Sequence, residues 1–408
     1  MIELKKGDTI WTNARVATMD DSQPGYGLII DHDLIIREDQ ILALVPSHTI
    51  NYPPSTEITD TRNALIIPGF IDCHTHLVFG GNRAKEWEMR LNGMPYVDIA
   101  NKGGGINSTV KATRNASEAE LYEITKQRLQ ALIDEGVTTV ESKSGYGLDL
   151  KNERKQLIVS KKLEQNFPVE IVNTLLSAHT IPPEYQNKGD EYIQLICDEI
   201  MPMLWKEGLF EAIDVFCENV GFTYNQTKTL FEHAKKLGIP VKGHTDQLSN
   251  LGGSGLVAEY NGLSVDHIEY LDEENIKKLS KARTVATLLP LAFYFLREPQ
   301  KPPVDLLRKY KIPIAVATDL NPGTSPFASI RMAMNAACVQ FGLTPLEALQ
   351  GVTKNAAKAL NRENTHGQIK PGYIANFCIW DVEEPVEIFY ELGKNPLIHR
   401  IYKGKITH

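Results

Sequence analysis

The sequence predicts an α/β fold in which a (β/α)8 barrel of the TIM type is joined to a small β-sandwich built from both ends of the chain. Apolar strands alternate with amphipathic helices through the middle of the chain, which is typical of βα units around a parallel sheet. Eight strand candidates can be counted there, and a (β/α)8 barrel typically needs about 250 residues. Short β segments recur at both ends.

Each strand candidate in the middle of the chain is nearly continuous in apolar residues, as expected for a parallel sheet covered on both faces. In order they are ALIIPGFIDCHTH (64–76), VTTVESKSGYG (137–147), VEIVNTLLSAHT (169–180), AIDVFCEN (212–219), PVKGHTDQ (240–247), SVDHIEYL (264–271), TVATLLPLA (284–292) and IPIAVATDLNPG (312–323). Amphipathic stretches such as 117–136 and 225–238 lie between them. An open, doubly wound sheet is the alternative, but no glycine-rich phosphate loop follows the first strand.

The two ends of the chain read as short strands and turns. TIWTNARVATM, LIIRED and QILALVP lie near the N-terminus, and GQIKPGYIANFCIWD and LIHRIYKGK lie near the C-terminus. One small β domain can be assembled from both ends if the termini lie close together. We therefore expect a composite β-sandwich from residues 1–63 and 361–408, and a barrel from residues 64–360.

Composition and charge exclude several classes of protein. The net charge of −8 gives no basic footprint for nucleic acid and argues against an anionic membrane surface. No apolar run approaches the roughly 20 residues that span a bilayer, and the start MIELKKGDTIWTN lacks the apolar core of a secretory signal. The five cysteines are scattered without a CxxC pair, which is typical of reduced thiols in a reducing compartment. We therefore expect a cytoplasmic enzyme that acts on a small-molecule substrate.

His74 and His76 stand at the end of the first predicted strand. Alternate residues of a strand point to the same side, so the two imidazoles leave the strand end together. This arrangement presents two nitrogen ligands to one divalent metal. Two ordinary histidines are the alternative, but the PGFID lead-in and the glycines just after His76 favour a metal site.

Ligand-like side chains also end other predicted strands. In a (β/α)8 barrel the chemistry takes place at the C-terminal strand ends. The candidates are the pair on strand one and one residue each on strands three, five, six and eight. In chain order they are His74, His76, His179, His244, His267 and Asp319. A lone strand-end histidine is usually a hydrogen-bonded structural residue, but five of the 11 histidines at one rim, with an aspartate, predict an active site.

This pattern resembles the amidohydrolase superfamily. The segments GGNRAKEWEMR, NKGGGINSTVKATR, SKSGYGLD, SAHTIPPEY, VKGHTDQLSNLGG and ATDLNPGTSP resemble, more narrowly, the imidazolonepropionase family. The resemblance covers nearly the whole chain. It implies hydrolysis of the ring amide C–N bond of 4-imidazolone-5-propanoate to N-formimidoyl-L-glutamate, a step of histidine degradation, and it implies a homodimer.

The resemblance also implies one divalent metal ion, held by His74, His76, His244 and Asp319. This donor set suits Zn²⁺, and imidazole also suits iron, Fe²⁺ or Fe³⁺. The metal would lower the pKa of a water molecule toward about 7. Asp319 would then act as general base and general acid, His267 would hydrogen-bond the nucleophile or the oxyanion, and His179 would polarise the ring carbonyl.

Substrate contacts follow from the resemblance as well. The residues that match are Arg83, Tyr146, His179, Gln247, Asn321, Gly323 and Thr324. Arg83 could grip the propionate carboxylate in bidentate fashion. Taken alone, these residues also have structural interpretations: a surface arginine, a packed tyrosine and a plain Asn-Pro-Gly turn.

Two departures from the wider superfamily bear on the mechanism. AIDVFCEN lacks the strand-four lysine that bridges two metals in many members, so we expect one metal ion. The segment offers Cys217 and Glu218 instead, and Glu218 is a lesser candidate for a ligand of a second metal ion. Gln247 stands where many deaminases have a proton-carrying glutamate three residues after the strand-five histidine, and an amide cannot carry that proton. A deaminase of an aromatic base is therefore disfavoured. A catalytically silent barrel is disfavoured because all four ligands are present.

Overall fold

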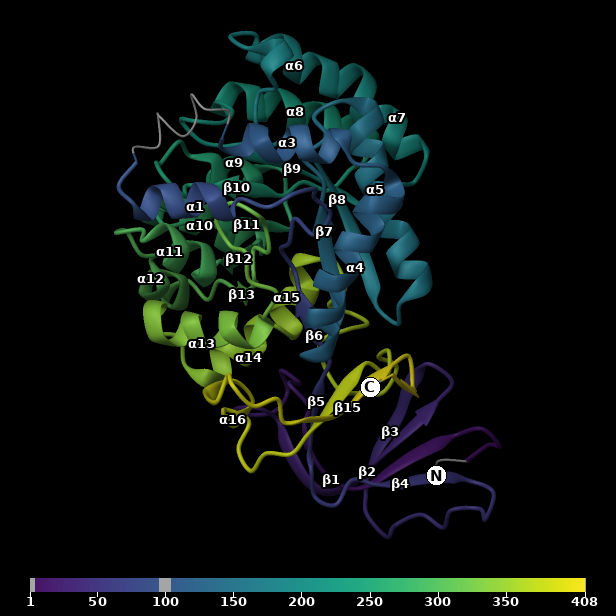
Figure 1. Ribbon diagram of the computed structural model, residues 1–408. Coiled ribbons are helices and arrows are strands. Elements are labelled where there is room, and N and C mark those ends of the chain that lie inside the picture. Colours follow the sequence, from purple (N-terminus) through teal and green to yellow (C-terminus); the bar gives the residue numbers. More distant parts are fainter. Residues whose placement is uncertain (1–3, 95–103, 408) are drawn as a thin grey trace.

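The computed structural model describes residues 4–94 and 104–407, and within them the chain forms two eight-stranded sheets (Figure 1). The start of the NKGGG segment, residues 101–103, lies outside the described residues. The strands are β1 Thr9–Ala17, β2 Leu28–Arg37, β3 Gln40–Pro46, β4 Glu57–Asp60, β5 Leu65–Pro68, β6 Phe70–Asp72, β7 Val137–Lys143, β8 Glu170–Ala178, β9 Ala212–Cys217, β10 Gly243–Thr245, β11 Ser264–His267, β12 Val285–Leu288, β13 Ile314–Val316, β14 Phe377–Trp380, β15 Leu397–Tyr402 and β16 Lys405–Ile406.

The central sheet is parallel and runs in chain order from β6 to β13. Its two edges meet just beyond those strands, where a parallel bridge joins Thr75 to Leu320. The amide of His76 donates to the carbonyl of Leu320 at 2.9 Å, and the amide of Asp319 donates to the carbonyl of His74 at 3.0 Å. The predicted (β/α)8 barrel is confirmed, and each of the eight predicted segments contributes one strand to it.

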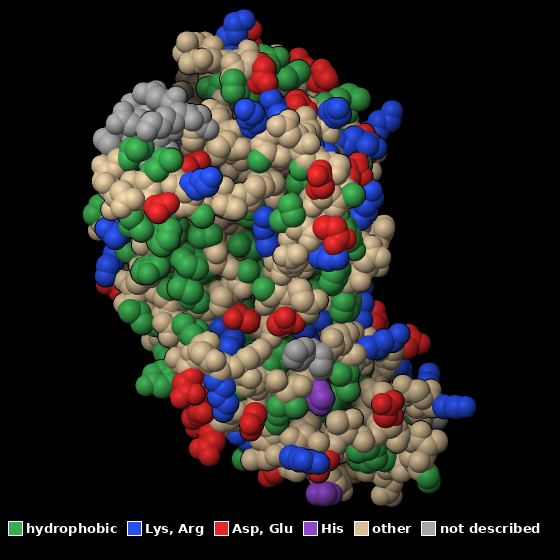
Figure 2. Space-filling view, viewed as in Figure 1, with side chains coloured by type: hydrophobic (Ala, Val, Ile, Leu, Met, Phe, Trp, Pro, Cys, Tyr) green, Lys and Arg blue, Asp and Glu red, His purple; other side chains and the backbone are tan. Residues whose placement is uncertain are grey.

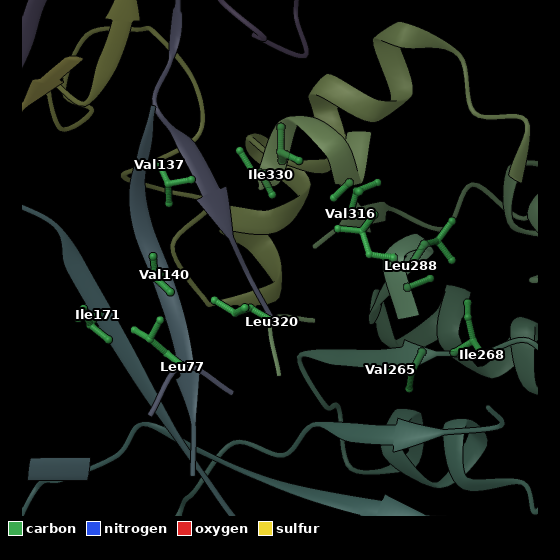
Figure 3. Close-up of a cluster of buried hydrophobic side chains, with 14 of the residues drawn as sticks. Leu77, Val137, Val140, Ile171, Val265, Ile268, Leu288, Val316, Leu320 and Ile330 are labelled. Carbon is green, nitrogen blue, oxygen red and sulfur yellow. The ribbon is translucent and has the colours of Figure 1, made fainter. Parts of the chain in front are cut away.

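Helices cover the outside of this barrel (Figure 1). They are α1 Ala84–Leu91, α3 Ile106–Asn115, α4 Glu118–Asp134, α5 Leu150–Asn166, α6 Gly189–Leu195, α7 Met201–Lys206, α8 Tyr224–Leu237, α9 Gly253–Glu259, α10 Glu273–Ala282, α11 Pro290–Leu296, α12 Val304–Lys309, α13 Ile330–Phe341, α14 Pro345–Gly351, α15 Lys354–Ala359 and α16 Glu387–Tyr390, with a 3₁₀ turn at Pro183–Tyr185 and a π-helical turn at Ile196–Ile200. Figure 3 shows part of the core cluster, which includes Val140, Val265 and Val316 of the strands and Ile330 of α13. Across the described residues, none of these helices has the length and apolar character needed to cross a membrane.

Local sequence signals explain where the predicted helices begin and end. Ser117 caps α4 and Thr223 caps α8, and each forms a capping box with a residue of the first turn. Such boxes satisfy backbone donors that have no partner inside the helix. Gly238 ends α8 with φ 72°, a left-handed conformation that glycine adopts without strain.

The two ends of the chain form the second sheet, in the order β16-β15-β14-β5-β1-β2-β3, with β4 paired to the same edge of β1 as β5 (Figure 1). An apolar cluster that includes Trp11, Leu34 and Phe377 joins residues from both ends. The prediction of a small β domain built from both termini is confirmed. Its strands are linked as one continuous, mostly antiparallel sheet.

The first predicted barrel strand is in fact divided between the two sheets. Leu65–Pro68 pairs with β1 and β14 in the terminal sheet, and Phe70–Asp72 pairs with β7 in the barrel. The chain crosses at Gly69, where a Cβ atom would lie 2.4 Å from the side chain of Thr138. The prediction that 64–76 forms one barrel strand was therefore wrong, because an apolar run cannot indicate which sheet pairs with it.

A partly buried group of charged side chains at the start of β8 predicts a pH dependence of stability. Glu170 accepts from Arg362 Nε at 2.9 Å and lies 3.0 Å from His366 Nε2. Burial raises the pKa of Glu170, but His366 and Arg362 outweigh it and lower this pKa from 4.5 to about 2. Because the folded-state pKa is depressed, the stabilisation is complete above about pH 4.5 and is lost as the pH falls toward 2.

Glu170→Gln is expected to lower the free energy of unfolding at pH 7 by at most about 3 kcal/mol. The difference from the wild type should shrink in urea titrations between pH 4.5 and pH 3. Glu211→Gln is the matched control, because Glu211 also pairs with Arg362 but is half exposed, so its effect should be below about 1 kcal/mol. An equal pH dependence of the wild type and Glu170→Gln would contradict this assignment.

Candidate metal centre and active site

Four predicted ligand side chains meet at the C-terminal end of the barrel. His74 and His76 follow β6, His244 lies on β10, and Asp319 follows β13; all four are at most 2% exposed. The Oδ1 atom of Asp319 lies 3.3 Å from His74 Nε2 and 3.4 Å from His76 Nε2. The Nε2 atoms of His76 and His244 lie 3.4 Å apart.

These distances fit a divalent metal ion. Two ligands about 2.1 Å from a tetrahedral Zn²⁺ lie about 3.4 Å from each other. His74 Nε2 and Asp319 Oδ1 are buried and have no hydrogen-bond partner in the described part of the chain, which is costly unless something else binds them. Within that part, His74, His76 and Asp319 form one group able to hold a metal, and His74, His244 and His267 form another.

Two buried carboxylates contact the predicted ligand histidines. Asp266 Oδ2 lies 2.7 Å from His74 Nδ1, and Asp214 Oδ1 lies 3.1 Å from His244 Nδ1. A carboxylate accepts the Nδ1 hydrogen and thereby leaves the Nε2 lone pair for a metal. Sequence reasoning missed both aspartates. The available signal was a single acidic residue inside an apolar strand: Asp214 lies three positions before the end of β9, and Asp266 lies one position before the end of β11.

Two further predicted histidines border this centre. The ring of His179 stacks on that of His76 at 4.9 Å between centroids, and its Nδ1 lies 3.1 Å from the carbonyl oxygen of Gly145. His267 lies 5.6 Å from the ring of His244, and its Nδ1 is buried without a partner in the described residues. Burial, together with neighbouring histidines, lowers the pKa of His179 well below 6.5; burial likewise lowers that of His267, to about 3 despite nearby Asp319.

The backbone is strained where β11 ends. His267 has φ 80° and Ile268 has φ 67°. A positive φ is rare outside glycine and is a true outlier for a β-branched residue such as Ile268. Such strain persists only where the surrounding structure enforces it, and it is concentrated at functional sites. It turns the chain sharply at His267, next to the ligand histidines.

Tyr146 lies on a loop that is organised by a residue the sequence reasoning did not select. The ring of Tyr146 is 5.3 Å from His179 and 5.8 Å from His76. Beneath the loop, Glu153 is fully buried and accepts hydrogen bonds from the amides of Gly145, Gly147 and Leu148. The carboxylate of Glu153 therefore fixes the SKSGYGLD segment and the position of Tyr146 in it.

Arg83 and Gly323 lie against each other at the rim of the barrel. A Cβ atom at Gly323 would lie 2.0 Å from Arg83 Nη1. Arg83 Nε also donates to Glu86 Oε2 at 2.8 Å, and Glu86 accepts from Ser108 Oγ at 2.7 Å. The guanidinium is thus held over the turn that follows Asp319. This position explains why the turn needs a residue without a side chain.

The side chain of Asn321 is used within its own turn. Its Nδ2 donates to the carbonyl of Asp319 and to Thr324 Oγ1, both at 2.7 Å. Its Oδ1 accepts from the amides of Gly323 and Thr324, both at 2.8 Å. An amide has two donor hydrogens and two acceptor lone pairs, so all four are occupied. The Asn321 side chain therefore shapes the turn. That the backbone and side chains of this turn contact the substrate stays a prediction.

Glu218 and Gln247 lie together after β9 and β10. Glu218 Oε1 accepts from the amides of Gln247 at 2.6 Å and Leu248 at 3.0 Å, and its Oε2 accepts from Ser249 Oγ at 2.5 Å. Glu218 is absent from the groups of described residues that could hold a metal. Its carboxylate braces the loop that carries the buried Gln247 side chain.

Comparisons of the sequence identify its relatives. The model of the amidohydrolase family matches residues 65–407. The chain is 58% identical, over all of its length and 98% of the relative, to "Imidazolonepropionase" of Photorhabdus laumondii. It is 58% identical to "Imidazolonepropionase" of Klebsiella pneumoniae and 55% identical to that of Salmonella typhimurium, with full coverage of both chains in each case.

Comparisons of the structure identify the same fold in more distant proteins. N-isopropylammelide isopropylaminohydrolase from Burkholderia multivorans superposes with a TM-score of 0.71 at 18% identity, over 98% of this chain and 97% of the other. 5-Methylcytosine deaminase from Klebsiella pneumoniae superposes with a TM-score of 0.70 at 16% identity, over 97% and 96%. The chain therefore belongs to the amidohydrolase family and, within it, to the imidazolonepropionases.

Proposed function

We propose that this protein hydrolyses the ring amide of 4-imidazolone-5-propanoate to N-formimidoyl-L-glutamate, as a metal-dependent step of histidine degradation. The convergence of three imidazole Nε2 atoms and one Asp319 oxygen at the barrel rim carries the proposal. The full-length similarity to imidazolonepropionases supports the choice of substrate. The proposed metal ligands are His74, His76, His244 and Asp319, which suit one Zn²⁺ or iron ion.

A divalent ion held by these residues would supply Lewis acidity, lowering the pKa of a water molecule toward about 7 and polarising the ring carbonyl. Asp319 takes the proton of the attacking water. The histidines around Asp319 hold its pKa well below 3.8 despite burial, so it is ionised, as a base must be. The carbonyl carbon gains the water oxygen, the C–N bond breaks, and Asp319 returns the proton to the released nitrogen.

The two remaining histidines orient the reaction. His267 has a buried, unpartnered Nδ1 and suits a hydrogen bond to the nucleophile or the developing oxyanion. In neutral His179 the Nδ1 hydrogen is donated to Gly145, so Nε2 can only accept. His179 therefore suits a ring N–H group of the substrate. This revises the predicted role, in which His179 donates to the ring carbonyl.

The propionate carboxylate is proposed to bind Arg83, with Tyr146, Gln247, Gly323 and Thr324 beside the ring. Arg83→Ala is expected to raise KM by about 30-fold, or about 2 kcal/mol, because a charged hydrogen-bonded pair is lost. Gly323→Ala should also raise KM, because its Cβ displaces the guanidinium. In steady-state assays, kcat should fall much less than KM rises.

Arg154→Ala is the control for this pair, since Arg154 is a half-exposed residue of α5 paired with Glu207. Its KM should equal that of the wild type. If Arg83→Ala also leaves KM unchanged, the propionate binds elsewhere. If Gly323→Ala leaves KM unchanged while Arg83→Ala raises it, the guanidinium can bind substrate from a displaced position.

A coupled assay tests the proposed reaction. Urocanase generates imidazolone propionate from urocanate in place, metal-loaded protein is added, and formimidoylglutamate is followed. Product that stops forming with a chelator and returns with Zn²⁺ or Fe²⁺ would support both the substrate and the metal dependence. No product from the metal-replete protein would reject the substrate, and ammonia release from an aromatic base would then point to a deaminase.

The homodimer and the cytoplasmic location stay predictions from the sequence. For the homodimer, the exposed apolar side chains around α1 and α11 are a candidate contact face (Figure 2). Trp87, Leu91 and Tyr294 are 44%, 53% and 55% exposed, and Trp87 stacks on Phe295 at 5.8 Å between ring centroids. Exposed apolar patches of this kind commonly mark protein contacts.

A further inference from the structure

The barrel interior below the metal centre contains charged side chains. Three carboxylates and two lysines, which we name the buried ion cluster, are at most 1% exposed: Glu141, Lys143, Asp214, Lys242 and Asp266. Barrel interiors are usually filled with branched apolar residues. Removing each ion from water costs several kcal/mol unless its partners compensate, so this cluster needs a reason beyond packing.

Lys143 lies at the centre of the cluster. Its Nζ atom is 2.6 Å from Asp214 Oδ2, 3.0 Å from Glu141 Oε2 and 3.4 Å from Asp266 Oδ2. These partners come from β7, β9 and β11, so the contacts cross the barrel interior. Asp214 and Asp266 are the same two carboxylates that bind the Nδ1 atoms of His244 and His74.

We propose that Lys143 is a positioning residue for the metal centre: by binding Asp214 and Asp266 together, it sets the orientation of His244 and His74 toward one metal ion. A residue that orients a ligand through its other ring nitrogen commonly changes metal affinity by 10–100-fold when it is removed. Here one ammonium group acts on two ligands from opposite strands. The inference rests on the proposed metal site but not on the proposed substrate.

The charge balance of the site supports this role. Asp319 and the three carboxylates of the cluster carry four negative charges, and Lys143 and Lys242 carry two positive ones. The remaining two negative charges match one divalent ion bound by neutral histidines. Without Lys143, Asp214 and Asp266 would repel each other in a region of low dielectric, and both would shift away from the positions that aim the imidazoles.

Lys242 provides a matched control inside the same cluster. It is as buried as Lys143 and also pairs with Glu141, at 2.7 Å from Oε1. Among the described contacts it reaches neither Asp214 nor Asp266. Loss of Lys242 therefore removes an equal charge and a similar buried side chain, while the carboxylates that hold His74 and His244 keep their lysine.

The experiment measures Zn²⁺ affinity by competition with a chromophoric chelator, for the wild type, Lys143→Met and Lys242→Met. We expect a 10–100-fold weaker affinity for Lys143→Met and less than about 3-fold for Lys242→Met. Formimidoylglutamate formation by Lys143→Met should recover at saturating Zn²⁺. A wild type that binds no Zn²⁺ would reject the metal site itself, whereas Zn²⁺ binding without turnover would reject only the substrate.

Other outcomes would overturn the positioning role. These are a Zn²⁺ affinity of Lys143→Met equal to that of the wild type, or an equal loss of Zn²⁺ affinity in Lys143→Met and Lys242→Met. If Lys143→Met does not fold, the double variant Lys143→Met with Glu141→Gln takes its place under the same criterion, because it keeps the charge balance and leaves Asp214 and Asp266 unchanged. A failure of both to fold, even with excess Zn²⁺, would assign Lys143 to stability alone and equally overturn the proposal.

Discussion

Asp319→Asn is expected to reduce turnover by at least about 1,000-fold, the upper part of the range for loss of a general acid–base group. The asparagine keeps the size of the side chain and the backbone bond to the carbonyl of His74. It removes the charge that faces His74 and His76 and the only carboxylate oxygen within 3.4 Å of either Nε2 atom in the described residues. Formimidoylglutamate formation measures the loss.

Two roles of Asp319 can be separated by metal content. If Asp319 acts only as a ligand, turnover should return when the variant is saturated with metal. If it also transfers the proton, the metal-saturated variant should stay inactive. Asp305→Asn, which changes a fully exposed aspartate of α12, should leave turnover unchanged. Wild-type activity of Asp319→Asn would reject the mechanism.

The barrel and the histidines at its rim could be predicted because their signals are local in sequence. Eight apolar strands separated by amphipathic helices predict a parallel barrel, and a histidine at a strand end is placed at the rim by that topology alone. His74, His244 and Asp319 were therefore found without knowledge of any contact. The proline and glycine that follow Asn321 also predicted the turn, but not that the Asn321 amide is used within it.

Lys143, Asp214 and Asp266 could not be paired from the sequence. Asp214 and Asp266 are each the one acidic residue of a short apolar strand. The partners that Lys143, Asp214 and Asp266 find outside their own strands lie 30 to 192 positions away in the sequence. One signal was present. In VTTVESK, Glu141 and Lys143 share the strand face of Thr139, and charges on a strand buried on both faces must find partners inside the barrel.

Glu153 shows a different limit. In the sequence it looks like an ordinary polar residue of the helix α5. In the structure it is fully buried and accepts hydrogen bonds from three backbone amides of the loop that carries Tyr146. Amphipathic spacing indicates which helix face turns inward, but not that a loop above the helix lacks partners for its amides. Backbone donors of a buried loop need acceptors, and the sequence does not state which residue supplies them.

Removal of the metal is expected to abolish turnover and to lower the thermal stability of the protein. Dialysis against a chelator should bring formimidoylglutamate formation to background, because no side chain of the site can replace the Lewis acid. Zn²⁺ or Fe²⁺ should restore it. Mg²⁺ should not, because it prefers oxygen ligands to three imidazoles.

The stability change follows from the same charge balance. Without the ion, Asp319 and the three carboxylates of the buried ion cluster exceed its two lysines by two negative charges. A proton on His74 compensates only one of them: burial and Lys143 lower the pKa of His74, but Asp266 and Asp319 outweigh them and raise it to about 9. Metal at 1,000 times its Kd would add about 4 kcal/mol to the free energy of unfolding, or about 5 °C in Tm for a chain of this length. His74→Asn should lose this metal-dependent Tm shift, whereas His48→Asn, at an exposed position, should keep it. A shift that persists in His74→Asn would place the stabilising ion at another site, and the charge balance in the barrel would then need a different counter-ion.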